Sequence, residues 1–149
     1  MMDNPLCQHQ CNKEHYTADA CVVWCFDDRF RPAREALAQS LGLRHYDLVS
    51  VAGGAKALVK ADNDADREAL VKQIKTSIRL HHPAKVILML HTDCGAYGGR
   101  KAFNDNEEAE RITLTRDLQQ AKQLLTARLQ NGVEIIPVFV TFRDTRIIS

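Results

Sequence analysis

Cysteine, histidine, aspartate and arginine gather in two short segments of the chain, CFDDR at 25–29 and HTDCG at 91–95. Each segment directly follows a run of apolar residues, VVW in the first case and VILML in the second. Cys25, His91 and Cys94 together offer two thiolates and an imidazole, a ligand set that suits zinc. Three protein ligands leave one position of a tetrahedron open, which is typical of a catalytic zinc site. The two segments therefore predict a metal centre, provided that the fold brings them together.

Each of these residues has a simpler explanation when it is taken alone. A buried cysteine usually packs as a small apolar side chain, and a lone histidine is usually a satisfied core or surface residue. The metal interpretation gains its weight from the combination at strand ends, next to Asp27, Asp28 and Arg29. The five cysteines form no disulfide framework and no Cys-x-x-Cys pair accompanies the candidates, so a thiol redox protein is the weaker interpretation.

The order of strands and helices must position the two motifs. Four segments have the composition of strands: 22–26, 45–51, 85–90 and 133–142. Three segments between them have apolar residues at helical spacing: 32–41, 64–82 and 107–131. This alternation predicts an open, mostly parallel sheet with helices on both faces, in which ligands bind at the carboxyl ends of the strands. Pro137 indicates an edge position for the last strand, because proline cannot donate to the ladder.

The length and composition fit one globular domain, with 149 residues, 45% of them hydrophobic and 26% charged. We expect residues 1–20 to form an N-terminal arm and residues 21–149 a single zinc-binding α/β domain. The net charge of +1, without a basic block, argues against a nucleic-acid partner. No stretch is long and apolar enough to cross a bilayer, and no signal peptide is recognisable, so we expect no membrane partner and a cytoplasmic location.

The expected arm contains its own group of metal-binding side chains, in the run CQHQCNKEH at 7–15. Cys7, His9, Cys11 and His15 suggest a second metal site. Spacing alone is weak support, and terminal arms are often mobile. Exposed side chains without a shared role are therefore the favoured interpretation.

The two main motifs resemble those of the β-class carbonic anhydrases. That family carries Cys-x-Asp-x-Arg after its first strand and His-x-x-Cys-Gly after its third, which CFDDR and HTDCG match in order and placement. Ala52 and Gly53 match the end of the family's Arg-Asn-Ala-Gly segment, whereas Ser50 and Val51 replace its first two residues. The resemblance covers about residues 20–140 and implies strand order 2-1-3-4, in homodimers or larger homo-oligomers.

The resemblance also implies an activity, the reversible hydration of carbon dioxide to bicarbonate by zinc hydroxide, with one zinc ion per chain. Cys25, His91 and Cys94 would be its ligands. Asp27 would accept a hydrogen bond from the group in the fourth position, and Arg29 would keep Asp27 ionised and oriented. The family also has a closed form in which the aspartate itself is the fourth ligand, and both states stay open here.

The remaining polar and glycine positions near the motifs have less specific explanations. Gly53, Gly54 and Gly95 are candidates for binding an anion such as bicarbonate through backbone amides, although loop turning explains them nearly as well. Asp28 is better explained as a solvated carboxylate near a helix start. Asp93 would either contact the metal ligands or cap the following loop.

Two other functions stay open. The scaffold also resembles hydrolases of carbonyl sulfide or carbon disulfide, which are linear molecules like carbon dioxide, and the width of the pocket would decide between them. A non-catalytic zinc-binding or bicarbonate-sensing homologue would bind the metal but would lack catalytic activity. The altered residues Ser50 and Val51 and the short chain leave this second alternative open.

Overall fold

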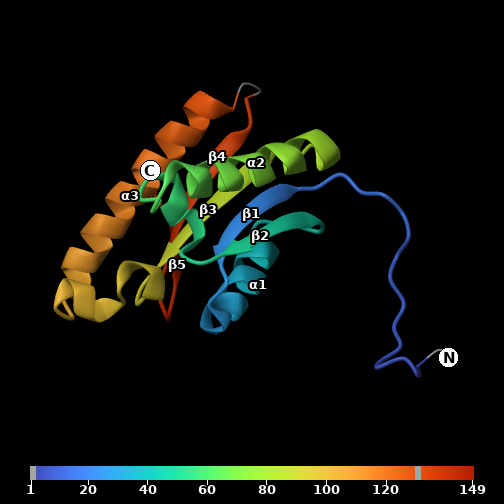
Figure 1. The fold of residues 1–149 in the computed structure, drawn as a ribbon, viewed down its shortest axis with the longest axis horizontal. Coiled ribbons are helices and arrows are strands. Elements are labelled where there is room, and N and C mark those ends of the chain that lie inside the picture. Colours follow the sequence, from blue (N-terminus) through green and yellow to red (C-terminus); the bar gives the residue numbers. More distant parts are fainter. Residues whose placement is uncertain (1–2, 130–131) are drawn as a thin grey trace.

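The computed structural model describes residues 3–129 and 132–149 (Figure 1). They form a five-stranded sheet in the order β2-β1-β3-β4-β5, in which four strands are parallel and β5 is antiparallel to β4. The strands are β1 (Ala20–Cys25), β2 (Tyr46–Val51), β3 (Lys85–His91), β4 (Glu134–Val140) and β5 (Thr145–Ile147). The expected α/β fold and the order of the first four strands are confirmed. β5 is an addition that the sequence pattern did not predict.

Within the described ranges, three α-helices cover the sheet: α1 (Arg31–Ser40), α2 (Asp64–His81) and α3 (Glu107–Arg128). Asparagine side chains cap α2 and α3, since Asn63 and Asn106 each accept a hydrogen bond from a backbone N–H of the first turn. α3 ends at Arg128, and the expected end at Asn131 lies outside the described residues. No helix in the described part of the chain is long and apolar enough to cross a membrane.

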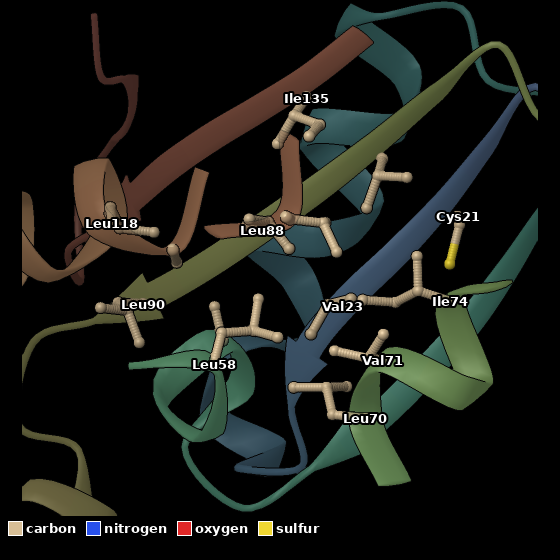
Figure 2. Close-up of a cluster of buried hydrophobic side chains, with 14 of the residues drawn as sticks. Cys21, Val23, Leu58, Leu70, Val71, Ile74, Leu88, Leu90, Leu118 and Ile135 are labelled. Carbon is tan, nitrogen blue, oxygen red and sulfur yellow. The ribbon is translucent and has the colours of Figure 1, made fainter. Parts of the chain in front are cut away.

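Successive residues of β1 point to opposite faces of the sheet and enter two different apolar clusters. Cys21 and Val23 pack with residues of α2 and α3 (Figure 2), whereas Val22 and Trp24 lie in the cluster on the side of α1. β1 is buried along its whole length. Burial on both faces explains why its sequence is a continuous apolar run, and it gives the motif at its end a rigid support.

Pro137 does not lie on an edge strand, so that expectation was wrong. β4 lies between β3 and β5, with Pro137 opposite Leu88 of β3. The Pro137 carbonyl accepts a hydrogen bond of 2.9 Å from the Ile148 N–H, on the side of β5. The backbone N and the carbonyl of one strand residue face the same neighbouring strand. The Pro137 nitrogen, which carries no hydrogen, therefore also faces the β5 side, just beyond Ile147, the last residue of β5 that is paired with β4. Proline is tolerated there because β5 is too short to require the donor.

Residues 3–19 contain no helix or strand, and Figure 1 shows the first part of the chain running away from the sheet. The segment is tied down near its end. The Tyr16 hydroxyl donates to Asp47 at 2.5 Å, and the Tyr16 ring lies against His81 with 4.2 Å between the centroids. The Ala18 N–H donates to the His81 carbonyl at 2.9 Å. The side chains of residues 3–15 are exposed.

Candidate metal centre

The carboxyl ends of β1 and β3 bring Cys25, His91 and Cys94 together. Their ligand atoms, two Sγ and one ring nitrogen, all lie within 4.8 Å of one another. β1 and β3 are neighbours in the sheet, so their last residues share one edge, and Cys94 follows in the loop after β3. All three side chains are buried. In the part of the chain that the structure describes, this is the one group of three or more His, Cys, Asp or Glu residues whose ligand atoms lie close enough to hold a single ion.

The ring of His91 has one nitrogen in use and one free. Nδ1 lies 2.6 Å from the Thr92 carbonyl, to which it donates. Nε2 is buried and has no hydrogen-bond partner. An unpaired polar atom in the interior is costly, and the Nδ1–H contact leaves a lone pair on Nε2. His91 therefore fits the role of a metal ligand, and with two thiols beside it the donor set fits zinc.

The two cysteines have opposite pKa shifts because they contact each other. The pKa of the Cys25 thiol is lowered, first because its sulfur accepts a hydrogen bond from Cys94, and also through the backbone N–H groups of Asp27 and Gly53. The pKa of Cys94 is raised because its thiol donates to Cys25, and because it is buried. Since the thiolate is the form that binds a metal, Cys25 is prepared for this role, and a cation between the sulfurs would replace their shared proton.

Asp27 and Arg29 form a bidentate pair beside these ligands. Nη2 of Arg29 donates to Oδ2 of Asp27 at 2.7 Å, and Nε donates to Oδ1 at 3.1 Å. Asp27 also accepts the Arg29 backbone N–H at 3.0 Å and so caps the short 3₁₀ turn Asp28–Phe30. The Arg29 bonds hold the pKa of the Asp27 carboxyl below its ordinary value. The Asp-x-Arg spacing thus creates an ionised, oriented carboxylate.

Asp93 caps the loop that follows β3, which is one of the two roles expected for it. Its Oδ1 accepts the Arg100 N–H at 3.0 Å, and its own φ of +55° is in the left-handed region. Its Oδ2 accepts from Arg29 Nη1 at 3.1 Å, a contact that the sequence did not predict. Arg29 therefore joins the loop after β1 to the loop after β3.

Glu110, on α3, is a residue of this centre that sequence reasoning missed. Its buried carboxylate accepts hydrogen bonds from the Thr92 hydroxyl and, at 2.9 Å, from the Asp93 N–H. Thr92 and Asp93 separate His91 from Cys94, so Glu110 holds the loop that connects two candidate ligands. No signal in the sequence distinguished it from the other glutamates in the first turn of α3.

The three glycines proposed for anion binding have different surroundings. The Gly53 N–H faces the Cys25 sulfur, and Gly53 has a φ of +77°. A Cβ at Gly54 would lie 2.4 Å from the Met89 carbonyl oxygen, so close packing against β3 requires a glycine there. A Cβ at Gly95 would meet no atom within 4 Å. Packing thus accounts for Gly54, and anion binding at all three stays a prediction.

Asp28 lies at the start of the short turn after Asp27, with a side chain that is 85% exposed. Arg31 approaches it at 3.8 Å. These surroundings agree with the simpler expectation of a solvated carboxylate.

Two hollows border the loops that carry the candidate ligands. One of about 580 Å³ lies between β2, α2 and the turn Gly54–Leu58, and reaches Ala52 and Ala96. The other, of about 490 Å³, includes Thr92 and Phe142. The three candidate ligands line neither hollow.

Residues 15–145 match a family model described as "Putative carbonic anhydrase". No curated protein matches the chain.

Solved structures with a similar fold include the β-carbonic anhydrase isoform I of Trichomonas vaginalis, with a TM-score of 0.61 at 12% identity over 95% of this chain and 87% of that one. The carbonic anhydrase of Streptococcus mutans has a TM-score of 0.60 at 17% identity, over 93% and 88% of the two chains. The apo form of a carbon disulfide hydrolase has a TM-score of 0.51 at 14% identity, over 89% and 80%. At these identities the likeness concerns the fold alone.

Proposed function

This chain belongs to the carbonic anhydrase family whose model it matches, and from that membership we propose that it is a zinc-dependent enzyme that converts carbon dioxide and water reversibly to bicarbonate and a proton. The observation that carries the proposal is the buried group of Cys25, His91 and Cys94, with the unpaired Nε2 of His91. These three residues would hold one zinc ion per chain.

Bound zinc would supply the activation of water, since a metal ion can lower the pKa of water from about 15.7 toward 7. The chain's own residues would orient the reactants. Asp27 is ionised and can only accept a hydrogen bond, so we assign it the role of accepting a hydrogen bond from the reacting water. This contact would direct a lone pair of the water oxygen toward carbon dioxide. Arg29 would act through Asp27 as a positioning residue, because its bidentate contact fixes the carboxylate.

The experiment that tests the proposal measures zinc content and carbon dioxide hydration on the same sample. We expect about one zinc ion at this site and a hydration rate well above that of buffer in a stopped-flow assay. Cys94→Ser should lose this zinc and the activity. Cys21→Ala is the matched control, because Cys21 is also a buried cysteine but lies in the core cluster away from the site.

The outcomes separate the alternatives. The metal centre itself would be contradicted if Cys94→Ser kept its zinc at this site, or if the wild-type protein held no zinc there. Zinc without hydration would favour a non-catalytic bicarbonate-sensing homologue. Consumption of carbonyl sulfide or carbon disulfide in place of carbon dioxide would favour the hydrolase function. The carbon disulfide hydrolase described above has a similar fold.

We also propose that the protein forms a homodimer or a larger homo-oligomer. The support is the edge strand β2, whose outer side pairs with no strand in the described residues and which carries the exposed Leu48. Sedimentation velocity should give at least twice the mass of one chain, and Leu48→Lys should reduce it. A cytoplasmic location stays a prediction.

A further inference from the structure

The N-terminal arm carries four side chains that bind soft cations, and the proposed function uses none of them. These are Cys7, His9, Cys11 and His15, and all four are exposed. Within the described residues, the side-chain hydrogen bonds of segment 3–15 stay inside the segment. The fold therefore gives these thiols and imidazoles no structural role in the core.

Two of the four are in contact at a distance that is typical of a zinc site. His9 Nδ1 lies 3.6 Å from Cys11 Sγ. With Zn–S near 2.3 Å and Zn–N near 2.0–2.1 Å, two such ligands on one tetrahedral ion are about 3.5 Å apart. His9 and Cys11 thus have the separation that two ligands of one ion require.

In the structure neither Cys7 nor His15 lies within reach of one ion together with this pair, so an ion has to draw them in by folding the arm. Cys7 lies two residues before His9, in a segment with no helix or strand, and extended backbone there would place both side chains on the same side. After Cys11, the Asn12 Oδ1 accepts the Glu14 N–H at 3.0 Å, which turns the chain before it reaches His15. The closed segment is short, so the entropy lost on closing it is small.

We propose that Cys7, His9, Cys11 and His15 bind a second zinc ion, separate from the one at Cys25, His91 and Cys94. Four protein ligands fill a tetrahedron, so this site is structural: it folds the arm and leaves no open position for a substrate. Binding releases the two thiol protons to solvent, and the two thiolates then balance the charge of the ion.

Zinc stoichiometry in protein purified under reductant tests the proposal. Wild type should hold two zinc ions per chain, and Cys7→Ser/Cys11→Ser should hold one and keep its hydration activity. Gln8→Ser/Gln10→Ser is the matched control, because it changes the residues between the ligands and should keep both ions. Cys94→Ser should lose the other ion only, so failure of the arm site is distinguishable from failure of the proposed enzyme. Equal zinc in wild type and in the Cys7/Cys11 variant would overturn the proposal.

Cleavage by trypsin gives an independent readout, because Lys13 lies inside the closed segment. Zinc should slow cleavage after Lys13 at least about tenfold in wild type and in the glutamine control, and a chelator should restore the fast rate. The Cys7→Ser/Cys11→Ser variant should be cleaved at the same fast rate with and without zinc. A wild-type arm that zinc does not protect would contradict the site.

Discussion

Arg29 contacts carboxylates from two different loops, Asp27 after β1 and Asp93 after β3. Its guanidinium also lies over two aromatic rings, 5.6 Å from the centre of Phe30 and 5.4 Å from that of Phe142. A planar, always charged group is needed for two carboxylates and two ring faces at once, and lysine does not offer one. At the scale of single residues, the geometry beside the metal ligands depends on this side chain.

Asp27→Asn should keep zinc but lose about 10²-fold or more in the rate of carbon dioxide hydration. An amide donates as well as accepts, so it no longer selects one orientation of the reacting water. Stopped-flow rates and zinc content, measured together, check this. Asp28→Asn is the control at the adjacent position, and its exposed side chain predicts an unchanged rate. Equal rates for Asp27→Asn and wild type would refute the role of Asp27.

At the scale of elements, α3 and the turn Gly54–Leu58 support the two strand ends from outside the sheet. Glu110 of α3 binds the loop between His91 and Cys94, and Gly54 packs directly on the backbone of β3. The ligand positions therefore depend on contacts made by elements that contribute no ligand.

Glu110→Gln should destabilise the protein by about 1–3 kcal/mol, because an amide cannot accept the hydrogen bonds of both Thr92 and Asp93 with its two ends. Zinc affinity should also fall by about 10-fold, since the loop that carries Cys94 loses its support. Urea denaturation and competition with a chelator measure the two effects. Glu108→Gln, at an exposed position of the same helix turn, should change the free energy of unfolding by less than about 0.5 kcal/mol.

Gly54→Ala should destabilise the protein by at least about 1–3 kcal/mol, because the new Cβ meets the Met89 carbonyl and the φ of +55° is unfavourable for alanine. Gly95→Ala, which adds a methyl group in open space, should be close to neutral for stability. Chemical denaturation of both variants is the measurement. Similar stabilities would mean that the 54–58 turn does not pack as closely as described.

At the scale of the whole molecule, several carboxyls have lowered pKa values, and Asp47 is a partly buried example. Burial alone would raise its pKa, but hydrogen bonds from Ser77, Tyr16 and His81 together lower it. A carboxyl with a folded pKa below its unfolded value of about 3.9 contributes stability that is fully present above that value. This stability is lost as the pH falls through the folded pKa.

The free energy of unfolding should therefore fall as the pH is lowered below about 4, and Asp47→Asn should show a shallower fall. The variant should also be less stable than wild type at neutral pH, because the amide replaces a charged acceptor of three hydrogen bonds. Denaturation at a series of pH values measures both effects. Parallel curves for wild type and variant would contradict the pKa shift of Asp47.

The sequence predicted those features that follow from strand pattern and parallel topology. Cys25 and His91 end adjacent parallel strands, so their meeting at one sheet edge could be expected before the fold was known. The support from Glu110 could not, because it depends on how α3 is placed over the loop after β3. β5 was missed because three partly exposed residues have no detectable pattern. Without β5, β4 was expected at the edge of the sheet, and Pro137 was therefore misjudged as an edge residue.

The short β5 also affects how the protein avoids aggregation. A sheet edge exposes unpaired backbone groups that can recruit further chains, and the edge offered by β5 is 3 residues long against 6 for β2. Edge-to-edge contact is therefore directed to β2. If the proposed homo-oligomer uses β2, pairing of β2 with β2 of a second copy would engage the same surface of both copies about a two-fold axis, so this contact would add no third chain. The unequal edges would then allow two sheets to join at β2 without extending into a fibre.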